Sequence, residues 1–273
     1  MRIIITGGSG FVGKALIREL IQRKVDPVAV ARHPFDSNFP QIIVPDYDHT
    51  PSGDVLVHLA EARDISVAKD QGATYIEQNM KMFQQLLKKD FKRVVYASSA
   101  AVYGDSITSP RRPVESLTPI DTYARAKLAC EGLVAGVDGV VARLANLYGE
   151  GMATNNVISH ILAQIPDREA IKIYDDSPVR DFLWIEDAAR GLADMAFGVT
   201  NGIFNLGTGI GTSIGELARC CLQIAGQTDR EIIALRPSKK SSCIILDTSK
   251  TISAFGWSPK ISLYAGLTRL MKG

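Results

Sequence analysis

The sequence contains few cysteines, and their arrangement excludes two classes of protein. Among its 273 residues, the four cysteines are Cys130, Cys220, Cys221 and Cys243. They have neither the spacing of a metal-ligand set nor the density of a disulfide scaffold. The sequence therefore predicts no metal site and four thiols that are buried or idle.

The chain also lacks a long apolar run and an excess of one charge. No apolar stretch approaches membrane-spanning length, and the first residues enter a strand pattern without the layout of a signal peptide. The 31 Lys and Arg residues oppose 29 Asp and Glu residues, which gives a net charge of +2. The basic residues form no stripe of the kind that binds nucleic acid. We therefore expect a cytoplasmic protein that binds neither membranes nor nucleic acid.

The sequence does contain short apolar runs that alternate with stretches of helical periodicity. With 46% hydrophobic and 22% charged residues, the composition is that of a globular protein. Continuous apolar strands separated by helices predict a parallel sheet covered on both faces. The clearest helix carries an apolar stripe from Ile76 to Leu87. The expected strands are Ile3 to Thr6, Val28 to Ala31, Ile42 to Val44, Val55 to Ala60, Val94 to Ser98 and Val140 to Leu144.

The pattern changes after Gly149, where Gly and Pro become frequent and the elements shorten. This change predicts a second lobe interleaved with the end of the first domain. We expect the doubly wound sheet to comprise residues 1–148 and 176–204, and the smaller lobe to comprise residues 149–175 and 205–273. Between Asp46 and Asp54 the connection is too short for a full crossover helix.

A glycine-rich turn follows the first expected strand directly. Gly7, Gly10 and Gly13 recur at three-residue spacing, and a helical pattern starts at Phe11. Between a strand and a helix, such glycines let the backbone approach a pyrophosphate, whose charge lies at the helix N-terminus. The turn predicts a dinucleotide-binding domain.

Arg32 stands at the end of the second expected strand, where NAD-selective domains usually carry an acidic residue. A carboxylate there would repel a 2′-phosphate, whereas a guanidinium can pair with it through two hydrogen bonds. NADP is therefore the expected cofactor. NAD is the alternative, in which case Arg32 is only a solvated residue at a strand end.

Tyr123 and Lys127 are four residues apart in a helix-forming stretch, which puts them on the same helix face. An ammonium group one turn away stabilises a tyrosinate against its ordinary pKa of about 10, as proton abstraction near neutral pH requires. By itself this spacing also fits a tyrosine whose ring packs in the protein interior and has no catalytic role. Ser99 directly follows the fifth expected strand, and ligands bind at the carboxyl ends of parallel strands. The three residues together indicate a catalytic set.

These motifs resemble those of the extended short-chain dehydrogenases, the nucleotide-sugar epimerase and dehydratase family, nearly from end to end. The resemblance implies a Rossmann fold with a smaller C-terminal substrate-binding lobe. It also implies that Tyr123 is the acid/base, that Lys127 lowers its pKa and binds the cofactor ribose, and that Ser99 hydrogen-bonds the substrate oxygen. Besides the glycine turn and the Tyr123 to Lys127 motif, the matching segments are His58 to Ala60, Ser98 to Gly104, Arg180 to Phe182, Asp247 to Lys250 and Phe255 to Lys260.

Further site residues follow from the resemblance. Asn79 corresponds to an asparagine that braces the site, and Arg63 to a position near the nicotinamide ribose. The implied ligands of the substrate diphosphate are Asn146, Arg180 and Arg236, and guanidinium groups suit phosphate oxygens. The alternative is that Arg180 pairs with a neighbouring Asp and that Arg236 lies in solvent. The implied cofactor-binding set is Gly7, Gly10, Phe11, Val12, Gly13, Arg32, Asp46, Leu59, Ala60, Arg63, Asn79, Tyr123 and Lys127.

Glu61 departs from the pattern, because the family commonly has a small residue at this place. A carboxylate near the nicotinamide must either point away or meet a partner such as Arg63.

Two alanines after Ser99 reduce the number of reactions that the enzyme can catalyse. Family dehydratases carry an Asp-Glu pair after the catalytic hydroxyl residue, and members that epimerise beside a ketone use a cysteine at the place of Ala101. Ala100 and Ala101 can transfer no proton. Hydride exchange at one carbon remains, either as reduction of a keto-sugar nucleotide (4-ketoreductase type), which NADP favours, or as 4-epimerisation of a nucleotide-sugar with retained cofactor.

An alternative of another class is a non-catalytic NADP-sensing or scaffold protein on the same fold. Such a protein does not need Ser99, Tyr123 and Lys127 together, so their presence favours an enzyme. The family commonly pairs through the helices that here contain Ile76 to Leu87 and Tyr123 to Leu133, so we expect a homodimer.

Overall fold

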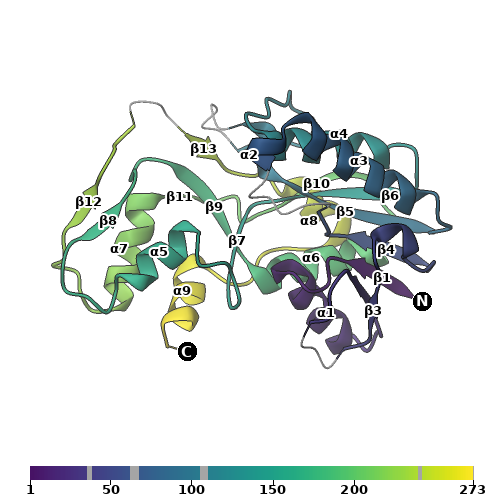
Figure 1. Cartoon of the computed structure of the whole chain (residues 1–273). Coiled ribbons are helices and arrows are strands. Elements are labelled where there is room, and N and C mark those ends of the chain that lie inside the picture. Colours follow the sequence, from purple (N-terminus) through teal and green to yellow (C-terminus); the bar gives the residue numbers. More distant parts are fainter. Residues whose placement is uncertain (36–38, 62–67, 105–109, 239–241, 273) are drawn as a thin grey trace.

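A seven-stranded parallel sheet forms the centre of the larger part of the molecule (Figure 1). We describe it from a computed structural model, in which the described residues are 1–35, 39–61, 68–104, 110–238 and 242–272. The strand order is β3-β2-β1-β4-β5-β6-β10, which reverses direction between β1 and β4. The strands are β1 (Ile3–Thr6), β2 (Val28–Ala31), β3 (Gln41–Ile43), β4 (Val55–His58), β5 (Arg93–Ser99), β6 (Gly139–Leu144) and β10 (Gly202–Leu206).

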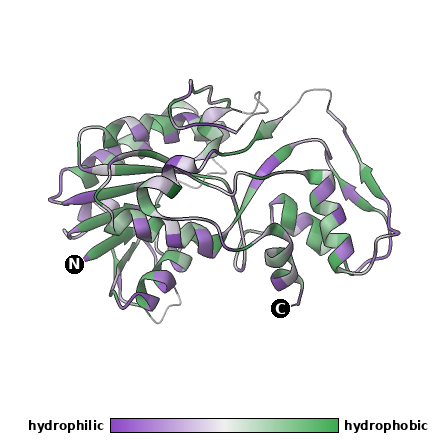
Figure 2. Ribbon diagram, turned by 180° about the vertical axis from the view of Figure 1, so that it is seen from behind, coloured by the Kyte–Doolittle hydropathy of each residue, from purple (hydrophilic) through white to green (hydrophobic). Residues whose placement is uncertain are grey.

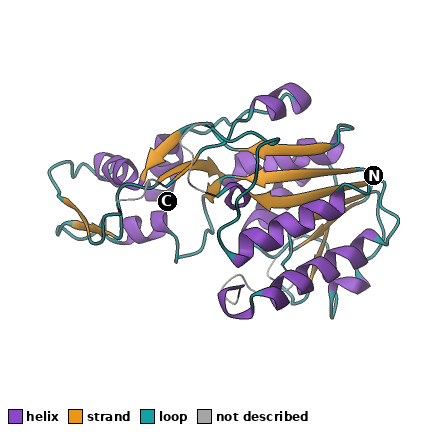
Figure 3. Ribbon diagram, turned by 90° about the horizontal axis from the view of Figure 1, so that it is seen from above, coloured by secondary structure: helices purple, strands orange, loops and turns teal. Residues whose placement is uncertain are grey.

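Helices cover both faces of this sheet (Figure 3). Along β1, Ile3 and Ile5 pack on the α1 side, while Ile4 packs on the α3 side. Burial on both faces explains why these strands are continuously apolar, and it confirms the predicted doubly wound α/β fold. On one side lie α1 (Phe11–Gln22), α6 (Ile185–Phe197) and α8 (Ser249–Phe255), and on the other α2 (Ala68–Gln71), α3 (Ala73–Leu87) and α4 (Thr122–Val134).

The connection between β3 and β4 contains only a 3-10 turn, η1 (Tyr47–His49). This agrees with the expectation that residues 46–54 are too few for a crossover helix. The strand β4 ends at His58, two residues before the expected end at Ala60. The reason is local, because Leu59 and Ala60 lie against the turn after β1, where a Cβ on Gly7 would be 2.9 Å from the Ala60 nitrogen.

A smaller lobe stands beside the sheet (Figure 1). Its apolar core includes Tyr148, Trp184, Leu217 and Leu267. The central strand β9 (Val179–Trp184) pairs with β7 (Asn146–Tyr148), β11 (Gly211–Ser213) and β13 (Cys243–Ile244). The remaining elements are β8 (Ile171–Ile173), β12 (Ile232–Ala234), α5 (Val157–Ala163), α7 (Ile214–Ile224) and α9 (Leu263–Lys272).

The last part of the chain returns to the large sheet. Leu246 and Trp257 belong to the same apolar core as β1 and α6, although the predicted lobe includes both residues. Figure 2 shows the hydrophobic residues concentrated on the strands of the large sheet. In the described part of the chain, no helix has the length and apolar character to cross a membrane.

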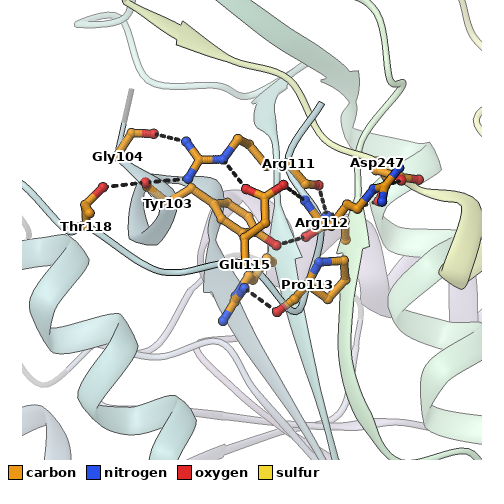
Figure 4. A network of polar contacts seen from close by, with 10 residues as sticks. Tyr103, Gly104, Arg111, Arg112, Pro113, Glu115, Thr118 and Asp247 are labelled. Atoms are coloured by element: carbon orange, nitrogen blue, oxygen red, sulfur yellow. Dashed lines mark hydrogen bonds and ion pairs between the residues drawn. The ribbon is translucent and has the colours of Figure 1, made fainter. Parts of the chain in front are cut away.

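A buried arginine joins the segment before α4 to this returning chain (Figure 4). The Arg111 backbone donates to the Ile245 carbonyl (2.7 Å) and accepts from the Asp247 N–H (2.9 Å). Its guanidinium is 1% exposed and donates to Glu115 (2.7 Å) and to the carbonyls of Tyr103 (2.9 Å) and Gly104 (3.3 Å). These contacts tie the segment that follows β5 to the chain that returns from the smaller lobe to the large sheet.

Candidate active site

A cavity of about 740 Å³ opens at the point where the strand order reverses, between β1 and β4. In open parallel sheets, this crevice beyond the carboxyl ends of the strands is where ligands bind. Its walls come from the turn after β1, the ends of β4 and β5, and the first turns of α4. The lining residues are Gly7, Ser9, Gly10, Phe11, Val12, Arg32, Tyr47, Leu59, Ala60, Glu61, Ala97, Ser98, Tyr123, Lys127 and Leu144.

The glycine turn forms one wall and suits an anionic diphosphate. Gly7 has φ +74°, a left-handed conformation that favours glycine, and a Cβ on Gly13 would clash with the Gly7 carbonyl oxygen. The helix α1 begins after Gly10 without a side-chain cap, and its first turn holds no acidic residue. The first N–H groups of a helix have no partner within the helix, so those of α1 suit a ligand, and the helix dipole favours a negative one. The residues present fit a dinucleotide cofactor.

Arg32 lies at the same cavity, as the sequence indicated. Its guanidinium donates to the Glu61 carbonyl (3.3 Å) and lies over the ring of Tyr47, 5.5 Å from the ring centroid. Tyr47 is a cavity residue that the sequence did not single out. Asp46 is exposed, accepts from the Asp48 N–H at 3.0 Å, and lies 2.7 Å from a nitrogen of the His49 ring. Asp46 is not among the lining residues, and its role as a cofactor ligand stays a prediction.

The three residues of the expected catalytic set come together. Tyr123 and Lys127 lie one turn apart on α4, whose first turn is capped by Asp121, which accepts from the Ala124 N–H at 2.7 Å. Ser99 ends β5 and hydrogen-bonds Tyr123 through its hydroxyl. The Lys127 ammonium lies 5.6 Å from the centre of the Tyr123 ring.

Lys127 has a partner that the sequence did not identify. Its ammonium donates to the Ala97 carbonyl (2.9 Å) and forms an ion pair with Glu61. The other Glu61 oxygen accepts from the Tyr75 hydroxyl at 3.0 Å. The Glu61 carboxylate thus does not point away from the cavity, and its partners are Lys127 and Tyr75. The expected partner Arg63 lies outside the described residues. Tyr75 could have been suspected, because it precedes Asn79 by four residues and so shares its face of α3.

The charges around Tyr123 act in opposite directions on its pKa. Burial raises the pKa of Tyr123, the Lys127 ammonium lowers it, the Glu61 carboxylate raises it, and the net result is a pKa above the ordinary value. Burial lowers the pKa of Lys127, but attraction to Glu61 and Tyr123 outweighs burial and raises it. Lys127 is therefore a cation throughout the physiological range.

His58 and Asn79 stand behind the cavity wall. Burial lowers the pKa of His58 to about 3, and its ring nitrogen Nδ1 lies 2.7 Å from the Thr6 hydroxyl. A neutral, buried histidine is part of the core and offers no base to the cavity. Asn79 is also buried and donates to the Tyr75 carbonyl (2.9 Å), so its contact is with the residue that holds Glu61.

The expected diphosphate ligands lie in the smaller lobe. Asn146 is opposite Phe182 in the β7–β9 pair, and Arg180 is two residues before Phe182, so strand alternation puts both on one face. The Arg180 guanidinium donates to the Ser242 hydroxyl (2.7 Å) and to the Val179 carbonyl (2.9 Å). The neighbouring Asp181 instead accepts from the Thr208 and Gly209 N–H groups.

Arg236 is exposed after β12, and its guanidinium lies over the Tyr174 ring, 5.6 Å from the centroid. Its part in substrate binding, like those of Asn146 and Arg180, stays a prediction.

Comparison with known proteins extends these observations. A UDP-glucose 4-epimerase from Halalkalibacterium halodurans is 26% identical over 95% of this chain and 91% of its own. UDP-glucuronic acid decarboxylase 1 from Arabidopsis thaliana is 27% identical over 99% of this chain and 69% of its own. The crystal structure of the Thermotoga maritima UDP-glucose 4-epimerase with UDP-glucose shares the fold, with a TM-score of 0.87, 24% identity, and coverage of 100% of this chain and 98% of that one.

The sequence profile of the NAD dependent epimerase/dehydratase family matches residues 3–207. This match spans the glycine turn, the end of β5 and α4, which line the cavity, and also β7 and β9, which carry the expected substrate ligands Asn146 and Arg180. The likeness therefore covers the site as well as the fold, as the sequence motifs indicated. The chain belongs to the NAD-dependent epimerase/dehydratase family, whose enzymes act on sugar nucleotides.

Proposed function

We propose that this enzyme oxidises and re-reduces one carbinol carbon of a nucleotide-sugar, so that the hydroxyl changes configuration, as in a 4-epimerase. The observation that carries the proposal is the contact between Ser99 and Tyr123, with Lys127 one turn away, at the cavity beside the glycine turn. Ala100 and Ala101 follow Ser99 without an ionisable group, which argues against elimination. The epimerase and decarboxylase relatives support redox chemistry on a nucleotide-sugar.

In this proposal Tyr123 transfers the proton and Ser99 orients the oxygen. Tyr123 takes the proton of the substrate hydroxyl as the carbon is oxidised, and later returns a proton to the same oxygen. The Ser99 hydroxyl donates a hydrogen bond to that oxygen, and the Lys127 ammonium stabilises the tyrosinate while it lasts. A bound nicotinamide cofactor supplies the hydride acceptor and donor.

The test is incubation of the purified protein with UDP-glucose, UDP-galactose and UDP-glucuronic acid, with products separated by chromatography. Interconversion of the two hexoses without net consumption of cofactor supports the epimerase. Release of carbon dioxide from UDP-glucuronic acid instead indicates a decarboxylase.

Tyr123→Phe should lower turnover by about 10²- to 10⁴-fold while cofactor binding persists, because only proton transfer is lost. Tyr264→Phe is the control, since Tyr264 is 50% exposed on α9. Undiminished turnover in Tyr123→Phe contradicts the assignment. Cofactor binding without turnover of any of these sugars favours the sensing or scaffold alternative.

Arg32 favours a second candidate, a reductase of keto-sugar nucleotides that uses NADP. It lies at the cavity, and its guanidinium suits a 2′-phosphate. Net consumption of NADPH with a 4-keto-sugar nucleotide supports this candidate over the epimerase.

Arg32→Asp should reduce the affinity for NADPH relative to NADH by about 10- to 100-fold, since a charge-assisted contact contributes about 1.5–3 kcal/mol. Fluorescence titration of wild type, Arg32→Asp and the control Arg168→Asp, an exposed arginine of the smaller lobe, measures the ratio. Equal affinity of the wild type for both cofactors excludes a role of Arg32 in selecting NADP.

A further inference from the structure

Glu61 forms a bridge between two helices at the edge of the cavity. One carboxylate oxygen pairs with Lys127 of α4, and the other accepts from Tyr75 of α3 at 3.0 Å. The Glu61 side chain is 23% exposed and the Lys127 side chain only 6%. A carboxylate and an ammonium that are mostly shielded from water attract each other strongly. The elements that carry the two residues fix the geometry of the pair.

We propose that Glu61 is a positioning residue of the site, whose carboxylate, held by Tyr75, orients the Lys127 ammonium beside Tyr123 and balances its charge. The proposal rests on the function proposed above for Tyr123 and Lys127. It gives a role to the residue at which this chain departs from its family's pattern.

The number of hydrogen bonds that Lys127 can donate supports the proposal that Glu61 orients its ammonium group. An ammonium group has three N–H donors and accepts nothing. Among the described residues, Lys127 directs donors to the Ala97 carbonyl and to Glu61, which leaves one for a hydroxyl in the cavity or for the Tyr123 oxygen. Without Glu61, a long flexible side chain would have one fixed partner instead of two.

The anchor of Glu61 is itself fixed. Tyr75 is fully buried, and the Asn79 amide hydrogen-bonds both its backbone carbonyl and its side chain. The bridge thus runs from Asn79 through Tyr75 and Glu61 to Lys127. A carboxylate held at both oxygens cannot turn away from the ammonium without breaking the Tyr75 contact.

The charge of Glu61 acts on Tyr123 as well. The carboxylate raises the pKa of Tyr123, in opposition to the ammonium of Lys127. Removal of the carboxylate leaves the ammonium unopposed, so the pKa of Tyr123 must fall. Glu61 therefore limits how far Lys127 lowers the pKa of Tyr123, a residue that in the proposed function both takes a proton and returns one. The other titratable groups around the pair are His58 from β4, Tyr96 from β5, Tyr75 from α3, and Asp121 and Cys130 from the α4 segment.

The test measures the titration of Tyr123 directly, without substrate or turnover. The full chain is labelled with ¹³Cζ-tyrosine, and the Tyr123 resonance is assigned by its loss in Tyr123→Phe. Glu61→Gln keeps the size and a hydrogen-bonding oxygen for Tyr75 but removes the charge. We expect the Tyr123 titration in Glu61→Gln to lie lower by about one pH unit than in the wild type.

Glu61→Asp is the matched variant, because it keeps the charge and shortens the side chain. Its Tyr123 titration should stay nearer to the wild type than to Glu61→Gln, even where the turnover of Glu61→Asp falls. Tyr75→Phe removes the anchor only, and should weaken cofactor binding, measured as a Kd by titration, more than it changes kcat. Circular dichroism checks that each variant folds.

An unchanged Tyr123 titration in folded Glu61→Gln overturns the proposal. A lower titration in that variant supports it, even if the protein turns over no nucleotide-sugar. In that case the proposed function fails while the electrostatic role of Glu61 stands, so the two outcomes are distinguishable.

Discussion

His58 illustrates how burial, with a smaller contribution from the Lys127 charge, decides the behaviour of a titratable side chain. It lies on β4 directly before the cavity wall, stacks on Phe83 with ring centroids 4.5 Å apart, and is 2% exposed. Its pKa falls to about 3 because the charged form would lose its hydration. The folded protein therefore holds a neutral histidine at every pH near neutrality.

This burial predicts a pH dependence of stability. The unfolded chain protonates His58 below its ordinary pKa of about 6.5, whereas the folded chain does so only near pH 3, so the contribution is complete above pH 6.5 and is lost as the pH falls toward 3. Between pH 7.5 and 5.0, the free energy of unfolding of the wild type should fall by about 2 kcal/mol more than that of His58→Phe.

Urea denaturation at the two pH values measures this difference. His160→Gln, a change at an exposed histidine of α5, should keep the wild-type dependence. An identical loss in wild type and His58→Phe would show that His58 is not protonated on unfolding in this range.

At the scale of elements, the turn from β1 into α1 determines how close a ligand can come to the backbone. Gly13 packs against the turn so tightly that a Cβ would clash with the Gly7 carbonyl and lie 2.7 Å from the Gly8 Cα. Backbone atoms cannot move aside as a flexible side chain can, so the turn itself would have to shift.

Gly13→Ala should therefore destabilise the protein by about 1–3 kcal/mol, as overpacking does, and weaken cofactor binding by at least about tenfold because the first-turn N–H groups move. Gly132→Ala on α4 is the matched control. Apart from its chain neighbours and its own helix backbone, no atom of the described residues lies within 4 Å of the added Cβ, so this change should stabilise the protein by up to about 1 kcal/mol. Thermal melts measure the stability of both variants, and cofactor titration measures their affinity for the cofactor. Normal cofactor affinity in Gly13→Ala would contradict the role of the turn.

At the scale of the whole molecule, Arg111 joins the segment that follows β5 to the chain that crosses between the two parts (Figure 4). Arg112 is its neighbour in sequence but is 70% exposed and pairs with Asp247 at 3.4 Å. The two arginines therefore offer a direct comparison of a buried and an exposed contact.

Arg111→Met should lower the free energy of unfolding by at least about 2 kcal/mol, because it removes a buried donor from the Gly104 carbonyl, from the Tyr103 carbonyl, which keeps only Thr118, and from Glu115. Arg112→Met should change it by less than about 1 kcal/mol, since exposed ion pairs contribute little. Urea unfolding curves of both variants test this, and equal effects would mean that the buried contacts do not hold the two parts together.

The sequence by itself determined the features that depend on neighbours along the chain. Continuous apolar strands between amphipathic helices predicted the doubly wound sheet, and glycines at three-residue spacing predicted the turn at Gly7. Tyr123 and Lys127 shared a helix face because they are four residues apart. Each of these patterns has a period set by the local backbone, so no knowledge of distant contacts was needed.

The tertiary structure alone decided which distant groups meet. Glu61 follows β4, Tyr75 belongs to α3 and Lys127 to α4, and only the packing of these elements brings the carboxylate between the hydroxyl and the ammonium. Ion pairs and hydrogen bonds act over a few ångströms in space, whatever the separation in sequence. The placement of Ser99 against Tyr123 was expected from family resemblance, whereas the charge that opposes Lys127 became visible only in the folded chain.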